Sequence, residues 1–307
     1  MRAVQIDSHG SVDVLEVREV PPPDLPSDGV VVEVLASSIN PGEAKIREGM
    51  PGADDQFPMG EGSDLAGRIV AVGEAVSGWS VGDEVIGWSD ERSAHAQLVA
   101  VPATQLARKP SAVSWPVAGS LYVAGGTAWV LRDAVKAESA DTVVVTAAAG
   151  GVGIVLVQLL IHAGVRVLGV AGGENTEFLQ GLGAEPVPYG DDLLARLRAA
   201  APDGVAAFLD CYGEGYTDLA LELGVPKDKV ATIADFGAAG QNGTNLVLGY
   251  QAVDAAVLGS LASLVADESL RVPIVATFPL EQVRDAYTLL DEGHTHGKIV
   301  LLPAGEA

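Results

Sequence analysis

Residues Thr142 to Gly164, TVVVTAAAGGVGIVLVQLLIHAG, contain the stretch that decides the fold. A run rich in valine leads into a glycine-rich corner, and a longer apolar segment follows the corner. A short apolar run of this kind is typical of a buried strand, and the longer one is typical of a buried helix. We therefore predict a strand, a tight turn and a helix here.

The corner has the spacing Ala148-x-Gly150-x-x-Gly153. Small residues at these positions let a dinucleotide pyrophosphate approach the backbone and let the helix pack close to the strand. The first N–H groups of the helix then face the anion. The alternative is a plain turn that binds nothing, but a second strand-like run, VRVLGV, follows at the expected distance. We predict a dinucleotide site formed by Ala148, Gly150, Gly151, Val152 and Gly153.

The segment GVAGGENTEF follows the second predicted strand, and we expect it to contact the adenosine ribose. Glu174 lies about 20 residues beyond the corner, where NAD-binding chains carry an acid for the ribose hydroxyls. Gly172 and Asn175 flank it and complete the predicted site. Glu174 could instead be an acid that stabilises the first turn of a helix. The segment contains no basic residue for a 2′-phosphate, and Thr176 is its one hydroxyl.

The pattern changes along the chain. Residues before about 115 form short runs rich in valine and isoleucine, bounded by Gly, Pro, Asp and Ser, which predict strands. One helix is expected over 40–49 and another over 114–136. Strand-like and helix-like runs then alternate, which is typical of a parallel sheet covered on both faces. The last segment reads as strand, helix, strand.

Composition excludes several classes of protein. The net charge of −23 disfavours binding to nucleic acid and to anionic membranes. No apolar run reaches the roughly 20 residues that a bilayer needs, and the N-terminus lacks the apolar region of a signal peptide. We therefore expect a cytoplasmic protein. The single cysteine, Cys211, excludes an internal disulfide and a thiolate-rich zinc site.

Several motifs in order resemble the medium-chain dehydrogenase/reductases of the zinc-free quinone oxidoreductase branch. The motifs are INPGEAKIREG, GSDLAGRIVAVGEAVSGWSVGDEVIG, AGGTAWVLRDA, VVVTAAAGGVGIVLVQL, LGAE, LDCYG and GHTHGKIVL. The resemblance implies a Rossmann domain, a doubly wound parallel sheet, inserted into a β-rich, GroES-like, partly barrel-shaped domain. The expected boundaries are 116–271 for the Rossmann domain and 1–115 plus 272–307 for the other. A homodimer joined through the edge of the Rossmann sheet is also implied.

The resemblance also implies site residues. Asn40 would hydrogen-bond the substrate or the nicotinamide ribose; the alternative is a helix N-cap side chain, and the two roles can coexist. Lys45 could bond a carbonyl oxygen, with a solvated helix-face lysine as the alternative. Thr127 matches a threonine near the nicotinamide, Phe236 matches a loop beside that ring, and Lys298 matches the strand at the cofactor cleft.

Zinc is not expected. Zinc-dependent relatives carry a cysteine where this chain has Asn40, and a histidine where it has Ser63. His294 and His296 lie two residues apart in a predicted turn without a third ligand nearby, so a metal site there is also not expected.

The expected function is hydride transfer from a reduced nicotinamide to a quinone or an α,β-unsaturated carbonyl, an acceptor already electrophilic by conjugation. The resemblance implies NADPH, whereas Gly172 and Glu174 permit NADH and oppose a phosphate. We expect NADPH first and keep NADH open. The alternatives are an enoyl reductase acting on a thioester or biosynthetic intermediate, and a non-catalytic NAD(P)H-binding sensor or scaffold.

Overall fold

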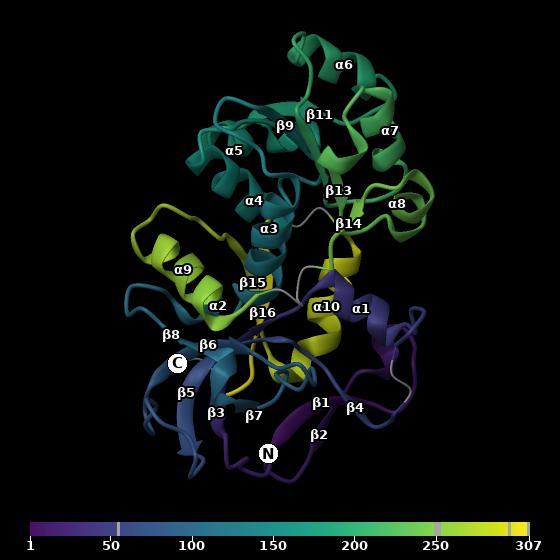
Figure 1. The fold of residues 1–307 in the computed structure, drawn as a ribbon. Coiled ribbons are helices and arrows are strands. Elements are labelled where there is room, and N and C mark those ends of the chain that lie inside the picture. The colour runs from purple at the N-terminus through teal and green to yellow at the C-terminus, as the bar shows by residue number, and fades with distance from the viewer. Residues whose placement is uncertain (54–55, 249–252, 294–295, 306–307) are drawn as a thin grey trace. The chain divides into compact units, whose positions relative to one another are not determined.

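The computed structural model describes the chain except for residues 54–55, 249–252, 294–295 and 306–307 (Figure 1). Two compact units emerge. Unit 1 comprises Met1–Val123 and Asp254–Ala307, and unit 2 comprises Ala124–Val253. Unit 1 is therefore built from two segments far apart in the sequence. In the part of the chain that the structure describes, no helix is both long and apolar enough to cross a bilayer.

Unit 2 is a parallel sheet with the strand order β11-β10-β9-β12-β13-β14. Its strands are β9 (Thr142–Val145), β10 (Arg166–Ala171), β11 (Glu185–Pro188), β12 (Ala207–Asp210), β13 (Val230–Thr232) and β14 (Asn245–Leu246). Counted along the chain, this is the order 3-2-1-4-5-6 of the Rossmann fold. The predicted fold of this region is confirmed.

Helices connect these strands (Figure 1). They are α4 (Gly151–His162), α5 (Thr176–Gly181), α6 (Leu193–Ala200), α7 (Tyr216–Glu222) and α8 (Phe236–Asn242). Apolar residues of α6 and α7, among them Leu197 and Ala220, form one buried cluster with Val144, Leu168 and Phe208 of the strands. The strands read as continuous apolar runs because the sheet is buried.

The described strands of unit 1 form two sheets. The larger has the order β15-β16-β3-β5-β6-β8, and β7 joins it by pairing with β3. Its strands are β3 (Gly29–Ser38), β5 (Asp64–Val72), β6 (Glu84–Trp88), β7 (Leu98–Pro102), β8 (Leu106–Arg108), β15 (Ile274–Pro279) and β16 (Lys298–Leu302). The smaller sheet, β2-β1-β4, consists of β2 (Glu16–Glu19), β1 (Arg2–Ile6) and β4 (Met59–Gly60).

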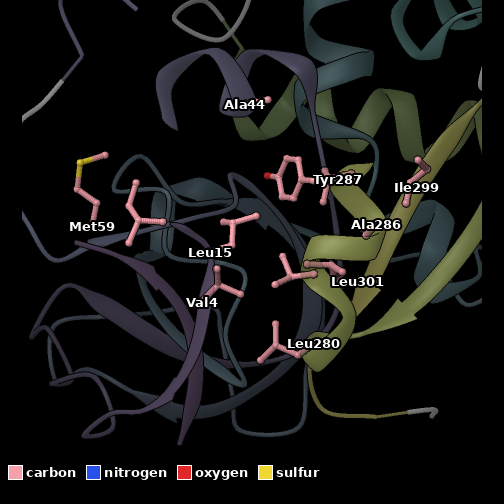
Figure 2. Close-up of a cluster of buried hydrophobic side chains, with 12 residues drawn as sticks. Val4, Leu15, Ala44, Met59, Leu280, Ala286, Tyr287, Ile299 and Leu301 are labelled. Atoms are coloured by element: carbon pink, nitrogen blue, oxygen red, sulfur yellow. The ribbon is translucent and has the colours of Figure 1, made fainter. Parts of the chain in front are cut away.

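The last strand of the chain completes the larger sheet. β16 pairs antiparallel with β3, with Val300 opposite Ser38. Helices α1 (Pro41–Arg47) and α10 (Val283–Asp291) share one buried cluster with β1 and β16. Figure 2 shows this cluster, in which Val4 and Ala44 from the first segment meet Tyr287 and Leu301 from the last. The β-rich domain expected from the sequence is therefore present and is closed by the C-terminal segment.

The units divide at Val123 and Asp254 rather than at 115/116 and 271/272. Helix α2 (Trp115–Ala118) packs against β3 and β5, and α9 (Ala255–Ala266) packs against β6 and β8. Both helices therefore group with unit 1.

The helix expected over 114–136 is two helices, α2 and α3 (Tyr122–Val135). The chain breaks between them because the Gly119 carbonyl accepts a hydrogen bond from the Ser38 N–H at 2.8 Å. A Cβ on Gly119 would lie 2.5 Å from the Ala36 oxygen, so only glycine fits there.

Candidate functional site

The glycine turn lies between β9 and α4, as the sequence predicts. A Cβ on Gly153 would lie 2.2 Å from the Ala147 oxygen, which explains why the helix needs glycine there to pack against the turn. Gly150 is the N-cap of α4 and, having no side chain, cannot cap it. The first-turn N–H groups, including those of Gly151 and Val152, are therefore available to an external anion. This turn fits a dinucleotide pyrophosphate.

Residues after β10 form the second part of this site. A Cβ on Gly172 would lie 2.0 Å from Glu174 Oε1, so the carboxylate covers this glycine. Asn175 donates from Nδ2 to Glu174 Oε1 at 3.1 Å. Its Oδ1 is buried and has no hydrogen-bond partner among the described protein atoms. The unpartnered amide oxygen and the exposed carboxylate are acceptors that suit ribose hydroxyls better than a phosphate.

Asp210, at the end of β12, was missed by the sequence analysis. It is fully buried and accepts hydrogen bonds from Thr146 Oγ1 and Thr232 Oγ1, each at 2.6 Å. The N–H groups of Tyr212 and Gly213 also donate to it, at 3.0 and 3.1 Å. Asp210 thus ties together the ends of β9, β12 and β13 beside the glycine turn. Its one sequence signal is an acid as the last residue of a buried strand.

Two exposed tyrosines mark the same edge of the sheet. Tyr189 directly follows β11, and its N–H donates to the Ala171 oxygen at the end of β10 at 3.1 Å. Tyr212 follows β12. In parallel sheets ligands bind outside the carboxyl ends of the strands. Large aromatic side chains exposed there were a signal that the sequence analysis did not use.

Two further predicted residues, and the single cysteine, are placed as follows. Thr127 is buried in α3. Phe236 begins helix α8 and does not lie in a loop, which corrects that expectation. The helix forms because Asp235 accepts a hydrogen bond from the Ala238 N–H at 3.1 Å and caps it. Cys211 stays a thiol, since burial raises its pKa.

Unit 1 holds a network of buried polar groups around Asn40. Asn40 Nδ2 donates to Asp64 Oδ2 at 2.9 Å and to the Ser38 oxygen at 3.5 Å, and its Oδ1 accepts from Lys298 Nζ. Asn40 stands at the N-cap position of α1 and forms a capping box with Glu43, whose carboxylate accepts a hydrogen bond from the Asn40 N–H. The Asn40 amide also joins the Lys298 ammonium to the Asp64 carboxylate.

Glu43 fixes this network in place. Its carboxylate accepts hydrogen bonds from the N–H groups of Asn40 at 2.9 Å and Ser63 at 2.7 Å, and from the Tyr287 hydroxyl at 3.3 Å. Burial raises the pKa of Glu43, and the charge of Asp64 adds to the rise. Glu43 therefore holds the start of α1, the turn before β5 and α10 together.

The two predicted lysines of unit 1 differ. Lys45 is exposed on α1. Lys298, at the start of β16, is 5% exposed, and its Nζ also donates to the Ile39 oxygen at 3.3 Å. Burial lowers the pKa of Lys298, while Asp64 and Glu43 oppose this shift.

The residues at the zinc-ligand positions of zinc-dependent relatives do not fit a zinc ion. Both ends of the Asn40 amide are bonded within the fold, and an amide and the Ser63 hydroxyl are poor substitutes for the thiolate and imidazole that zinc selects. Among the residues that the structure describes, no three His, Cys, Asp or Glu side chains form a metal-binding group. His294 lies outside the described residues, so the expectation for the histidine pair is not examined by the structure.

Comparison with known proteins agrees with this arrangement. Residues 26–111 match the model of the alcohol dehydrogenase GroES-like domain, and residues 182–301 match that of a zinc-binding dehydrogenase. The chain is 29% identical to the NADPH-dependent alkenal/one oxidoreductase of Arabidopsis thaliana chloroplasts, over 99% of this chain and 80% of the relative. It is 28% identical to the quinone oxidoreductase of Pseudomonas aeruginosa, over 98% of this chain and 99% of the relative.

Solved structures give the same result. The quinone oxidoreductase from Coxiella burnetii aligns with a TM-score of 0.87 at 27% identity, over 98% of this chain and 99% of that one. The Escherichia coli quinone oxidoreductase, solved with NADPH, aligns with a TM-score of 0.89 at 23% identity, over 99% and 100% of the two chains. The chain belongs to the medium-chain dehydrogenase/reductase superfamily. Within it, the chain belongs to the quinone oxidoreductase branch.

Proposed function

We propose that this protein is an NAD(P)H-dependent oxidoreductase that transfers a hydride to a quinone or an α,β-unsaturated carbonyl compound without a zinc ion. The observation that carries the proposal is the uncapped N-terminus of α4 at Gly150, against which Gly153 lets the turn pack closely. Relatives named as an alkenal/one oxidoreductase and as a quinone oxidoreductase support this class of acceptor. When bound, the nicotinamide supplies the hydride.

The residues of each unit have separate tasks in this proposal. In unit 2, the N–H groups of Gly151, Val152 and Gly153 bind the pyrophosphate, and Glu174 and Asn175 bind the adenosine ribose. Thr127 and Phe236 contribute to the nicotinamide end. In unit 1, Asn40 accepts a hydrogen bond from Lys298 and donates one to Asp64. The Lys298 ammonium, held in this network, supplies a fixed hydrogen-bond donor that stabilises developing charge at no cost in reorganisation.

NADPH is the cofactor we propose first, because the Arabidopsis relative is named as NADPH-dependent. The Glu174 carboxylate, which covers Gly172, works against a 2′-phosphate. Replacing it tests the choice directly. Glu174→Gln should lower the Kd for NADPH more than the Kd for NADH, because it removes the repulsion of one charge. An equal change for both cofactors would place Glu174 away from the 2′ position.

The experiment that tests the function measures oxidation of NADPH and NADH by the purified protein against a panel of quinones, enones and crotonyl-type thioesters. Oxidation with quinones or enones supports the proposal. Oxidation with thioesters alone would favour an enoyl reductase. Cofactor binding by fluorescence without turnover on any acceptor would favour a sensor or scaffold.

A homodimer in the cytoplasm, without nucleic acid or membrane partners, completes the proposal. β14 is the last strand of the unit 2 sheet in the described part of the chain, and Leu246 and Leu248 beside it are exposed. Light scattering of the purified protein should give the mass of two chains, and Leu246→Lys should shift it toward one. The net charge of −23 supports the lack of a nucleic-acid partner. An electrophoretic shift of labelled RNA at low salt would contradict it.

A further inference from the structure

The hydrogen bonds of Asn40 leave it little to offer a substrate. Both N–H groups of its amide have acceptors inside the fold, Asp64 Oδ2 at 2.9 Å and the Ser38 oxygen at 3.5 Å. Asp64 is itself held on both sides, since its Oδ2 accepts from Ser38 Oγ at 2.6 Å and its Oδ1 from the Val123 N–H at 3.0 Å. Asn40 could therefore donate to a ligand only by breaking a buried bond, which is costly.

The hydrogen bonding of Lys298 differs from that of Asn40. An ammonium group has three N–H donors, and two of them are used, by the Ile39 oxygen at 3.3 Å and by Asn40 Oδ1. The third has no acceptor among the described residues. Buried donors are almost always satisfied in folded proteins. A donor held rigidly by two neighbours and left with a third N–H is the arrangement that a ligand oxygen completes.

We propose that Lys298, rather than Asn40 or Lys45, donates a hydrogen bond to the carbonyl oxygen of the acceptor and gives it a proton as the hydride arrives. This inference rests on the proposed function and names the proton donor of that reaction. It also replaces the cofactor contact that the resemblance implies for Lys298. Asn40 becomes a positioning residue, because its amide orients the ammonium and couples it to Asp64.

The step balances in atoms and electrons. The C–H bond at C4 of the dihydronicotinamide breaks, and its hydrogen and electron pair form a new C–H bond at the β-carbon of the enone. The π electrons move toward the carbonyl oxygen, which takes a proton from the Lys298 ammonium to give an enol. The nicotinamide is oxidised by two electrons and the enone is reduced. Lys298 is left as a neutral amine and regains its proton from solvent, and the enol becomes the saturated ketone.

The surroundings of Lys298 support this role. Burial lowers the pKa of Lys298, which makes its ammonium a better proton donor, while Asp64 of β5 and Glu43 of α1 oppose this shift. The Tyr287 hydroxyl of α10 donates a hydrogen bond to Glu43, one of the two carboxylates that act on Lys298. His95, whose Nε2 lies 3.3 Å from the Ser38 oxygen, has its pKa lowered to about 4 by burial. It is therefore neutral near neutral pH and does not compete as a proton donor. Figure 2 shows the Tyr287 side chain of α10 in the buried cluster that it shares with Ala44 of α1.

The test uses Lys298→Met, which keeps the length of the side chain but has no donor, and Lys298→Ala. Lys227→Met, at an exposed lysine of unit 2, is the matched control. Single-turnover hydride transfer to an enone should fall by about 10²–10³-fold in both Lys298 variants, the usual cost of losing one donor to an oxyanion. The Kd for NADPH, measured by fluorescence, should stay within about twofold of the wild type because the lost contact is to the acceptor. The control should change neither.

Chemical rescue separates catalysis from structure. Methylammonium and related amines should restore part of the rate of Lys298→Ala, and more acidic ammonium ions should restore more, because the proton moves in the same step. A merely structural lysine would show no such dependence on amine acidity. The pH profile of kcat should also lose its fall at high pH in Lys298→Met.

Three outcomes would overturn the inference. A raised Kd for NADPH with an unchanged transfer rate would show that Lys298 contacts the cofactor rather than the acceptor. Rates equal to the wild type would remove it from the reaction. A lost rate with no rescue and no change in the pH profile would make it structural. In all three the wild type reduces enones, so the proposed function survives, whereas a wild type that reduces no acceptor would defeat the function itself.

Discussion

Each unit buries a carboxylate, and the two are treated very differently. Asp210 in unit 2 is fully buried and accepts hydrogen bonds from two threonine hydroxyls and two N–H groups. Glu61 in unit 1 is 1% exposed, and neither of its oxygens has a hydrogen-bond partner among the described protein atoms. The same chemical group thus holds strand ends together in one unit and is a buried carboxyl without hydrogen-bond partners in the other.

The difference shows that hydrogen-bond partners, more than burial, decide whether a buried carboxylate stabilises the structure around it. Burial raises the pKa of Glu61 to about 8, and the charge of Glu43 adds to this, while Arg47 and Arg92 oppose it. Near neutral pH Glu61 is therefore largely protonated. Arg47, fully buried, stacks over the Tyr287 ring at 4.6 Å, and its two terminal nitrogens also lack hydrogen-bond partners among the described atoms. Unit 1 therefore buries a carboxyl and a guanidinium whose terminal atoms lack hydrogen-bond partners among the described residues, which is unfavourable.

Removing Asp210 should have the largest effect. Asp210→Ala leaves Thr146, Thr232 and two N–H groups buried without an acceptor, so the free energy of unfolding should fall by about 3–5 kcal/mol. Urea unfolding followed by circular dichroism measures it. Asp210→Asn, which keeps the volume and one acceptor, should lose less. Equal losses for both variants would mean that packing rather than hydrogen bonding holds the strand ends.

Replacing Glu61 should have a smaller effect, with the opposite sign at high pH. The folded pKa is about 8 and the reference value is 4.5, so between these values the folded state keeps a proton that the unfolded state releases. Wild-type stability that is present below pH 4.5 is therefore lost as pH rises toward 8. Glu61→Gln does not titrate, so relative to the wild type it should gain about 1–3 kcal/mol between about pH 5 and pH 9.

Comparing the variant with the wild type at each pH isolates Glu61. The pKa of His95 is lowered from 6.5 to about 4, so His95 contributes stability that is lost as the pH falls from 6.5 to about 4. It acts equally on both proteins and cancels in the difference. A difference between variant and wild type that does not change with pH would show that Glu61 is ionised throughout, paired with Arg47 or Arg92.

An exposed carboxylate should matter least. Glu185 accepts two hydrogen bonds from Arg166, at 2.7 and 2.6 Å, on the surface of unit 2. Hydrogen bonding to Arg166 lowers the pKa of Glu185, so its contribution is present above pH 4.5 and lost as pH falls below that value. Glu185→Gln should cost less than about 1 kcal/mol at pH 7 and less still in high salt. Thermal unfolding at two salt concentrations measures it, and a loss as large as that of Asp210→Ala would break the comparison.

Local sequence patterns predicted most of unit 2. The apolar run before Thr146, the glycines after it and the alternation of strands and helices each depend on neighbours in the chain, so the turn and the parallel sheet could be recognised. The break at Gly119 could not, because it depends on a hydrogen bond to Ser38, which lies in a different strand. Helical spacing continued through the break and hid it.

The buried networks were beyond the reach of sequence reasoning. The bond from Thr146 to Asp210 joins residues 64 positions apart, and the bond from Lys298 to Asn40 joins residues 258 apart. Asn40 and Lys298 were each recognised as site residues, but nothing in either motif indicated that one bonds the other. The same holds for Glu61, whose lack of partners is a property of the packed unit rather than of its neighbours in sequence.

The pairing of β3 with β16 has a consequence for synthesis of the protein. Lys298 bonds the Ile39 oxygen across 259 positions, so β3 leaves the ribosome long before its neighbour exists. At about 5–20 residues per second this interval lasts roughly 13–50 s. During that time the whole of the inserted unit has emerged and is free to fold, while the Ser37–Ser38 end of β3 lacks its partner strand. A nascent chain halted before β16 would thus contain a folded unit 2 and an incomplete sheet in unit 1. We expect chaperones to bind the incomplete sheet.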